Sequence, residues 1–574
     1  MKDTHRVNSG PVGLSQPISE QIWAAKYQHK TDGHCHDHTI QNTWSRVAAG
    51  LAACEDGTQR AKIEGQFFAA MQNFQLIPAG RILAGSGTDR HVTLSNTFVM
   101  RTLPDSVEGI MDTLKDAALT MKMGGGIGFD FSTLRPSGFR VEGLDCPAAG
   151  PLAAMDIFDA TCRMLVTGMG RGAMMATMRC DHPDIEAFVM AKSDRTRLRN
   201  FNLSVMVTDD FMEAVEEDRT WSLKWEGEVT RTVRARDLWN VIMKQTHSAA
   251  EPGVLFIDRI NAQNPMHYRE TIAATNSCAE QPLPPFGTCP LASINLAQLV
   301  SNPFTKEARL DVGRLRSLTS TAVRMLDNVL EVSRFPLAQQ AALAKRQRRI
   351  GIGVTGVADA IAMLGAKYGS AKAVFLLGSW MQTLQNAAYA ASADLARERG
   401  AFPDFDAAHH MQTAQVQSLD PEVRALVAEH GLRNATLTSI APTGTISMLA
   451  GNVSSGIEPI FATSFNRVVT RPDGTKETER VMDYAAMVFG RLYGEDTPLP
   501  ESFVSVADLS PADHVAMQAA AQKWVDSGIS KTVNCPEDIS FEAFKSVYRD
   551  AFDSGCKGCT TFRPNDVTGS VLST

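Results

Sequence analysis

The chain of 574 residues lacks the features that mark several large classes of protein. No stretch approaches about eighteen consecutive apolar residues, which argues against a membrane-spanning helix. The N-terminal segment MKDTHRVNSGPVGLSQPISEQ holds no apolar run of the kind that a secretory signal needs. Lysine and arginine number 56 against 63 aspartates and glutamates, so the net charge of -7 offers no basic surface for duplex nucleic acid. We therefore expect a cytoplasmic protein whose partners are neither membranes nor nucleic acids.

Cysteine is scarce as well, because ten in the whole chain are too few for a disulfide framework. In a reducing compartment, a special cysteine is more often catalytic or metal-binding than structural. One cluster invites a metal site: His29, His34, Cys35, His36 and His38. It lacks a second ligand pair at zinc spacing, so we interpret it as an exposed polar loop and expect no directly bound metal.

The order of apolar patterns predicts a helical N-terminal region over 1–75 and one α/β domain over 76–574. Helical spacing is present at 18–27 and 43–53, whereas 202–208, 350–357 and 436–440 have the pattern of short strands. Glycine-rich turns and helices follow several strands, which indicates parallel β/α units with functional loops at strand C-termini. The expected architecture is barrel-like or doubly wound.

Residues 105–121 predict an amphipathic helix that ends at Gly124-Gly125-Gly126. Asp105 and Glu108 form a capping pattern at its start. Its apolar stripe is compatible with a core helix or with a dimer interface.

Two glycine-rich turns differ in meaning. Residues 351–356 match G-x-G-x-x-G, but they follow a basic segment and lack the acidic residue that a dinucleotide site requires, so a tight strand end is favoured. Residues 441–447 (APTGTIS) follow a short strand, and their hydroxyls and backbone amides can form an anion cradle. The alternative for the second turn is an ordinary polar loop.

The segment TNSCAEQPLPPFGTC at 275–289 is the most informative in the chain. Prolines and a glycine within 282–287 exclude a helix. In an extended backbone, Asn276, Cys278 and Glu280 would project from one face. An amide, a thiol and a carboxylate there can hold a hydroxylated substrate, attack it and move its proton. The alternative is a buried filler thiol. Cys289 follows a proline-rich reversal and either approaches Cys278 or faces the same cavity.

Several long motifs, in order, resemble the class II, adenosylcobalamin-dependent ribonucleotide reductases. They are PAGRILAG, NSCAEQPLPPFGTC, RRIGIGVTGVADA and PTGTISMLAGNVSSGIEP, and the resemblance covers about 15–571. It implies a ten-stranded α/β barrel with a central finger loop. The chain has only seven tyrosines and shows no pattern of a radical relay. This agrees with a radical that bound adenosylcobalamin generates at the site itself.

The resemblance implies a role for each matching residue. Cys278 matches the cysteine that becomes a thiyl radical and takes the 3′ hydrogen of ribose. Glu280 matches the general base for the 3′ hydroxyl, and Asn276 matches the amide that holds ribose oxygens. Cys289 matches one of the two cysteines that reduce the 2′ carbon. The resemblance also implies three groups of substrate-binding residues. Two groups match the phosphate-binding loops: Pro78, Ala79 and Gly80, and Pro442, Thr443, Gly444, Thr445 and Ile446. The third group is Ser95, Asn96 and Thr97.

Loops at 124–137 and 168–179 resemble those through which a deoxynucleoside triphosphate effector, bound at a homodimer interface, selects the substrate base. Within this effector region at about 105–180, the matching residues are Gly124, Gly125, Gly126, Arg171 and Gly172.

Three features depart from the family pattern. Thr97 stands where the partner of Cys289 should be, and a threonine cannot form a disulfide. Gly170-Arg171 replaces the paired arginines of the effector loop. In place of a C-terminal tail with relay cysteines, the nearest feature is Cys556-Lys557-Gly558-Cys559, which is a redox pair, half of a zinc site or two ordinary thiols.

We therefore expect radical reduction of ribonucleotides to 2′-deoxyribonucleotides for DNA synthesis, with an altered reducing step. The electrons would come from a small donor such as formate or from another thiol, such as Cys146, Cys162 or Cys180. Two alternatives remain: a different cobalamin-dependent radical enzyme on this fold, and a non-catalytic, effector-binding paralogue.

Overall fold

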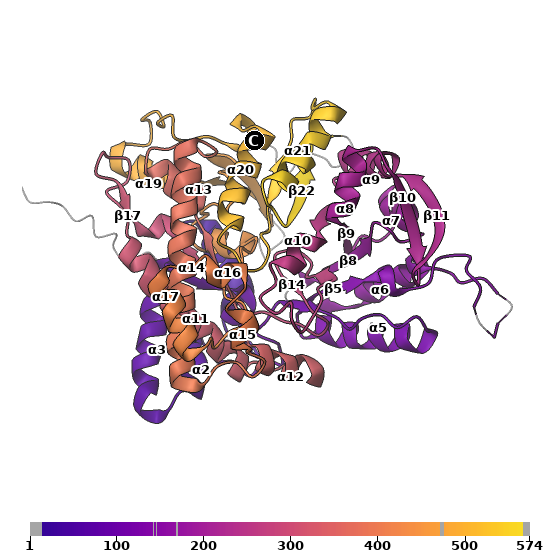
Figure 1. Cartoon of the computed structure of the whole chain (residues 1–574). Coiled ribbons are helices and arrows are strands. Elements are labelled where there is room, and N and C mark those ends of the chain that lie inside the picture. The colour runs from indigo at the N-terminus through magenta and orange to yellow at the C-terminus, as the bar shows by residue number, and fades with distance from the viewer. Residues whose placement is uncertain (1–13, 142, 145, 168–169, 471–475, 566–574) are drawn as a thin grey trace, which may run out of the picture.

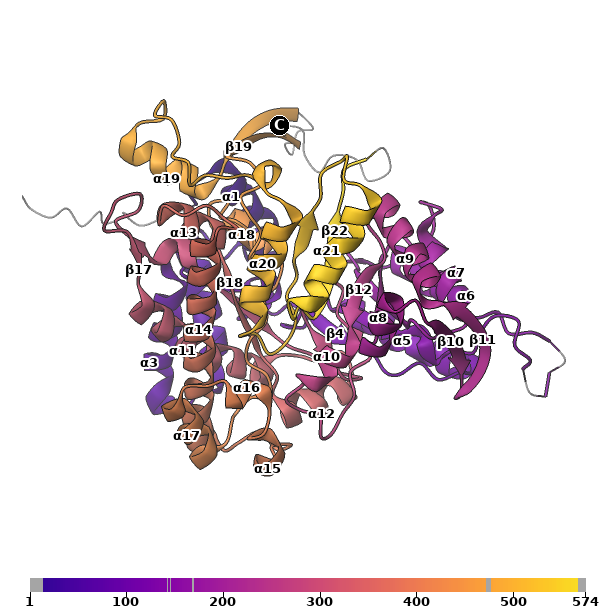
Figure 2. The same ribbon diagram turned by 45° about the horizontal axis from the view of Figure 1, so that its top comes forward.

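The computed structural model describes residues 14–141, 143–144, 146–167, 170–470 and 476–565. The chain forms two lobes with separate hydrophobic cores. In Figure 1, one lobe carries α5–α9 and the other carries α2, α3, α11, α14 and α17, while the C-terminal α20, α21 and β22 lie between them. Figure 2 shows the same arrangement from a second direction. No helix among the described residues is long and apolar enough to cross a bilayer.

The predicted N-terminal helical region is confirmed. It consists of α1 (Pro17–Ile22), a π-helical turn (Trp23–Tyr27), α2 (Ile40–Leu51) and α3 (Gly57–Met71). The histidine cluster forms a small hairpin of β1 (Lys30–Thr31) and β2 (His34–Cys35), which Asp37 anchors through an ion pair with Arg46. Within the described residues, no group of three or more histidine, cysteine or acidic side chains could hold a metal ion.

The first lobe is built on a seven-stranded sheet. Its order is β21 (Thr532–Asn534), β22 (Gly558–Phe562), β12 (Gly253–Phe256), β9 (Phe201–Val207), β8 (Met174–Arg179), β5 (Gly126–Asp130) and β4 (Thr97–Val99). All neighbours are parallel except β12 and β22. This confirms the predicted strand at 202–208 and the predicted parallel β/α units.

The second lobe contains a three-stranded sheet of β18 (Gly351–Thr355), β15 (Leu291–Asn295) and β3 (Leu76–Pro78). Every residue of these strands is buried, as is usual for strands covered on both faces. The glycines of 351–356 lie in a tightly packed sheet, as predicted, because a Cβ at Gly353 would overlap the backbone of Ser439. Gly351 and Gly353 are inside β18, however, and only Gly356 is at the strand end. The expected strand at 436–440 is reduced to isolated bridges that join Thr438 to Ile352 and Ile440 to Ile529.

The remaining helices cover these sheets. Around the first lobe are α5 (Val107–Lys122), α6 (Pro151–Met164), α7 (Ile185–Val189), α8 (Asp209–Glu216), α9 (Ala235–Ala249) and α10 (Ile257–Ala262). In the second lobe are α4 (Gly80–Gly85), α11 (Val312–Val332), α12 (Ala338–Gln347), α13 (Val357–Met363), α14 (Ala371–Arg399), α15 (Ala407–His410), α16 (Ala414–Gln417) and α17 (Pro421–His430). The C-terminal third adds α18 (Gly444–Leu449), the hairpin of β19 (Ser464–Thr470) and β20 (Lys476–Met482), α19 (Tyr484–Tyr493), α20 (Pro511–Gln522) and α21 (Phe541–Asp553).

The predicted helix at 105–121 is α5, but its predicted cap is wrong. Ser106 is the N-cap, and its hydroxyl accepts a hydrogen bond from the amide of Gly109 at 3.0 Å. Asp105 instead pairs with Arg135 at 2.7 Å. A serine satisfies the first free amides as well as an aspartate does, so the side chain of Asp105 is free for the ion pair.

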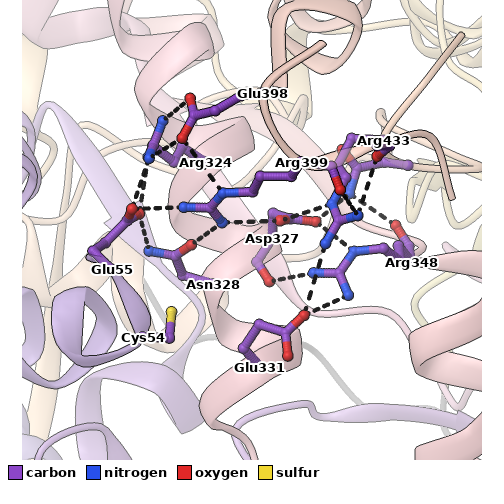
Figure 3. A network of polar contacts seen from close by, with 12 residues as sticks. Cys54, Glu55, Arg324, Asp327, Asn328, Glu331, Arg348, Glu398, Arg399 and Arg433 are labelled. Atoms are coloured by element: carbon purple, nitrogen blue, oxygen red, sulfur yellow. Dashed lines mark hydrogen bonds and ion pairs between the residues drawn. The ribbon is translucent and has the colours of Figure 1, made fainter. Parts of the chain in front are cut away.

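Within the second lobe, a buried network of charges joins the end of α2 to α11 and α14 (Figure 3). Glu55, just after α2, accepts hydrogen bonds from Arg324 of α11 and from Arg399 of α14, each as short as 2.6 Å. Burial alone would raise the pKa of Glu55, but hydrogen bonds from Arg324, Asn328 and Arg399 outweigh it and lower the pKa to about 2. Asp327, also on α11, accepts from Arg348 at 2.8 Å, from Asn434 at 3.1 Å and from Arg399 and Arg433 at 3.4 Å.

Candidate active site

The segment with the predicted amide, thiol and carboxylate is a hairpin loop between the lobes, not an extended strand. It joins β13 (Ala274–Thr275) to β14 (Pro282–Leu283). The turn closes through a hydrogen bond from the Asn276 amide to the Gln281 carbonyl at 3.2 Å, and Ala279 has a left-handed backbone with φ of 64°. The predicted backbone was therefore wrong, yet the turn still directs Asn276, Cys278 and Glu280 into one cavity. We call residues 276–281 the finger.

The finger is fixed by contacts with its backbone from both lobes. Asn202 of β9 donates to the carbonyl of Ser277 at 2.7 Å, and the hydroxyl of Ser439 donates to the carbonyl of Glu280 at 2.9 Å. Two glycines allow close approach: a Cβ at Gly128 would overlap the carbonyl of Thr275, and one at Gly528 would lie 2.6 Å from the carbonyl of Ala279. The reactive side chains therefore stand on a rigid support.

Cavity A, of about 290 Å³, lies on one side of the finger. It is lined by Lys26, Tyr27, Ala79, Gly80, Arg81, Asn96, Asn276, Ser277, Cys278, Glu280, Leu291, Ala292, Ser293 and residues 441–446. Of the predicted substrate-binding residues, Ala79, Gly80, Asn96 and the whole of 442–446 line this cavity, whereas Pro78, Ser95 and Thr97 stand behind its wall.

Cavity B, of about 350 Å³, lies on the other side of the finger. Its walls include Asn202, Ser204, Gly253, Cys278, Gln518, Gly528, Ser530, Lys531, Lys557, Cys559 and Thr560. The thiol of Cys278 is thus accessible from both cavities, with Ser277 as the other residue that lines both. A group bound in cavity B and a substrate bound in cavity A would meet at this sulfur.

The protonation of the finger residues suits hydrogen-atom and proton transfer. Burial raises the pKa of Cys278 to about 12, and the nearby carboxyl of Glu280 adds to the rise. Cys278 therefore carries its hydrogen at neutral pH and is a poor thiolate nucleophile. Burial raises the pKa of Glu280 to about 7, against a smaller lowering by the hydrogen bond from Asn276. Among the described residues, Glu280 Oε2 is shielded from solvent and has no partner.

Cys289 is buried under cavity A and does not line it. The hydroxyl of Thr97 donates to the carbonyl of Cys289 at 2.5 Å, so the two residues face each other across β4 and the start of β15. The three other thiols considered in the sequence lie elsewhere. Cys162 packs beside Gly172, Cys180 follows β8 in the first core, and Cys146 is exposed. The structure thus brings none of these three thiols to Cys289.

Residues 441–446 form the expected turn, and α18 starts at Gly444. The hydroxyl of Thr443 is not free for an anion, because it accepts from the amide of Gly456 at 2.7 Å and contacts the hydroxyl of Thr355 at 3.0 Å. Thr443 instead orders the turn, with a left-handed φ of 56°. Gly444 faces open space, so backbone amides of the helix start can approach a ligand.

The glycines assigned to the effector loops lie beside cavity A. Gly124, Gly125, Gly126 and Gly172 line cavity C, of about 160 Å³, which shares Arg81 and Asn96 with cavity A. Arg171 is in β7 (Gly170–Arg171), and its side chain lies outside the described part of the structure.

Cys556 and Cys559, the possible redox relay, are both buried in the first core. Burial raises the pKa of Cys556 to about 12 and also raises the pKa of Cys559 well above its ordinary value. Cys559 lines cavity B.

Sequence reasoning missed several lining residues. Lys26 and Tyr27 belong to the N-terminal helical region, whose pattern gave no sign of a site. Arg81 directly follows the predicted Ala79-Gly80 and could have been included with them. Lys531 and Lys557 are buried, and Lys531 is paired with Glu458. No motif marked either of them as part of a cavity.

Nearly the whole chain is similar to known ribonucleotide reductases. The family described as "Ribonucleotide reductase, all-alpha domain" matches residues 14–91, and "Ribonucleotide reductase, barrel domain" matches residues 95–562. A vitamin B12-dependent ribonucleoside-diphosphate reductase of Mycobacterium tuberculosis is 36% identical over 552 residues, which cover 92% of this chain and 76% of that protein. One of Thermoplasma acidophilum is 34% identical over 587 residues, which cover 99% of this chain and 73% of that protein.

Proposed function

This chain belongs to the ribonucleotide reductase family, and from that premise we propose that it reduces ribonucleotides to 2′-deoxyribonucleotides by a vitamin B12-dependent radical reaction at Cys278. The observation that carries the assignment of the site is the position of Cys278 in the wall between cavities A and B. The names of the relatives favour diphosphate substrates. Anaerobic incubation in the dark with adenosylcobalamin, ribonucleotides and a reductant should form deoxynucleotides, which chromatography detects.

Cavity B fits the adenosyl part of adenosylcobalamin. Its walls offer hydroxyl and amide groups, and Gln518 Oε1 is buried there without a partner among the described residues. When bound, the cofactor supplies the radical that oxidises the Cys278 thiol. The residues that would hold it include Ser204, Gln518, Ser530 and Thr560.

The side chains around cavity A have separate roles in the proposed reaction. The Cys278 radical takes the 3′ hydrogen of the ribose and returns it at the end of the reaction. Glu280 accepts the proton of the 3′ hydroxyl. Asn276 turns its carbonyl oxygen toward the Gln281 amide at 3.0 Å, which leaves its amide nitrogen for Glu280 and the ribose. Residues 442–446, with Ala79 and Gly80, bind the phosphates.

The raised pKa of Glu280 predicts the pH dependence of turnover. A general base works in its ionised form, so kcat/KM should rise with pH through about 7 and then level off. Glu280→Gln should lower kcat/KM by about a hundredfold or more and remove this inflection. Glu542→Gln, an exposed site on α21, is the matched control and should keep both. An unchanged inflection in Glu280→Gln would assign the titration to another group.

The two electrons for the 2′ carbon do not come from a disulfide between residues 97 and 289, since Thr97 has no sulfur. We propose a small donor such as formate, whose oxidation to carbon dioxide releases two electrons and one proton. Cys289 would then relay a hydrogen atom by itself, which requires its buried thiol to reach the substrate through the wall of cavity A. The choice over a substitute thiol is supported by the separate hydrophobic core that holds Cys162 and Cys180 and by the exposure of Cys146.

A single-turnover experiment separates these routes. Enzyme reduced beforehand and freed of thiols should form no deoxynucleotide until formate is added, and label from formate carbon should then appear in carbon dioxide. A stoichiometric yield without any donor, with Cys289 found in an internal disulfide by mass spectrometry, would contradict the proposal and identify the second thiol.

The remaining expectations are also proposals. The bridges Phe98–Thr288, Ile352–Thr438 and Ile440–Ile529 join the two sheets and support the ten-stranded barrel. The domain boundary near residue 75 stays a prediction. The location is taken to be cytoplasmic. A redox relay through Cys556 and Cys559 needs an opening that would expose them. Thr97 also favours a second candidate, a cobalamin radical enzyme that needs no dithiol, whereas the complete finger disfavours a non-catalytic paralogue.

A homodimer that binds a deoxynucleoside triphosphate effector fits the surface of α5 and α6. Five large apolar side chains of these two helices are exposed: Val107, Met111, Leu119, Ile157 and Met164. The two helices pack together and precede the loops at 124–137 and 168–179. Such a face is typical of an interface between copies.

A further inference from the structure

Arg81 lies where cavity A adjoins cavity C. It is the second residue of α4 and lines both cavity A and cavity C. Its guanidinium packs flat on Gly124, where a Cβ would lie 2.6 Å from both Cζ and Nη1. The charged end therefore lies at cavity C, whose walls contain no residue of the finger or of 441–446.

This guanidinium has no partner in the described part of the protein: no hydrogen bond, ion pair or ring contact reaches it. Tyr27 is the nearest ionisable group, but burial raises the pKa of its phenol, so it is neutral. A partly buried arginine that has no acceptor for its N–H donors loses some of its hydration without compensation, which lowers its pKa. The arrangement is thus suited to a ligand that brings acceptors.

Asn96 supplies the complementary group. It too lines both cavities, and its Oδ1 is shielded from solvent without a hydrogen bond from any described residue. Its backbone carbonyl accepts from the amide of Gly126 at 2.9 Å, which fixes the residue beside the glycine run. The donors of Arg81 and the unpaired acceptor of Asn96 therefore belong to two residues that line the same two cavities.

We propose that Arg81 and Asn96 bind the base of the substrate nucleotide, which rests on the proposed function. In a nucleotide, the ribose lies between the phosphates and the base. If the phosphates bind at 442–446 and the ribose at the finger, the base lies in the remaining part of cavity A, which is lined by Arg81 and Asn96 and adjoins cavity C. Arg81 donates to an acceptor on the base edge, and Asn96 accepts from a ring or amino N–H. The acceptor for Arg81 is a base carbonyl oxygen, which guanine, cytosine and uracil present, whereas adenine offers only ring nitrogens.

The proposal predicts a loss that depends on the base. In calorimetric titrations, Arg81→Gln should weaken binding of GDP, CDP and UDP by about tenfold to a hundredfold, the range for a hydrogen bond to a charged group. Binding of ADP should weaken by less than about threefold. Arg81→Lys keeps the charge but not the paired N–H donors of the guanidinium, so its affinities should lie between those of the wild type and of Arg81→Gln. Arg60→Gln, an exposed change on α3, is the control and should alter none of the four.

Equal weakening of all four nucleotides would overturn the proposal and assign Arg81 to the phosphates, and unchanged binding would overturn it as well. Turnover measured in parallel should show raised KM with little change in kcat for the carbonyl-bearing substrates. Wild-type protein that forms no deoxynucleotide from any of the four would refute the proposed reductase activity, whatever the titrations show, so the two failures are distinguishable.

Discussion

Replacing Cys278 with serine should abolish deoxynucleotide formation, with a loss of at least about three orders of magnitude. The thiol is the one group that both cavities reach with chemistry for hydrogen-atom transfer, and a serine O–H bond is too strong to take its place. The measurement is product formation with adenosylcobalamin under anaerobic conditions in the dark. Nucleotide binding should be unchanged, because serine keeps the shape of the finger.

Cys146→Ser is the matched control for this experiment. It makes the same chemical change at an exposed thiol outside the cavities, and its activity should equal that of the wild type. Substantial turnover by Cys278→Ser would remove the radical from the finger and leave the assignment of the site without its central residue.

Asp327→Ala should cause the largest loss of stability, about 3–5 kcal/mol. Asp327 is fully buried and accepts hydrogen bonds from three arginines, Arg348, Arg399 and Arg433 (Figure 3). Without its carboxylate, these guanidinium groups stay in the interior with less compensation. Asp327→Asn keeps the side-chain volume but removes the charge, so it should lose most of the same amount of unfolding free energy. The expected result is a lower midpoint of urea unfolding.

Asp394→Ala is the comparison on the neighbouring helix. Asp394 pairs with Arg397 of α14 at 2.9 Å, and both side chains are more than half exposed, so its loss should cost no more than about 0.5 kcal/mol. Equal midpoints for the variants at 327 and 394 would show that the buried network does not stabilise the protein.

Local patterns were sufficient where the residue type itself dictates the structure. The apolar spacing of α2 and α5 and the alternation of β9 are read directly from side chains that must be buried. The finger was found for a related reason, since an amide, a thiol and a carboxylate close together are rare in a core. Its backbone was mispredicted because Ala279 adopts a left-handed conformation that only the surrounding contacts impose.

Contacts between distant segments were not predictable from one sequence. The entry of Lys26 and Tyr27 into cavity A depends on how the N-terminal helices pack on β3 and α4. The free guanidinium of Arg81 depends on the absence of partners, which no local pattern reveals. The role of Thr443 in ordering its turn likewise arises from Thr355 and Gly456, which come from separate loops.

The way in which the finger is held has a consequence for biosynthesis. Gly128 and Gly528 contact the backbone of the same loop although about 400 residues separate them in the sequence. Ser439, which lies between them in the sequence, donates a hydrogen bond to the loop. Contacts of such long sequence separation form late and slowly during folding. A ribosome-bound chain that has reached residue 500 already has Cys278, yet it lacks Gly528 to seat the loop. The finger therefore becomes able to confine a sulfur radical only after residue 528 has been translated.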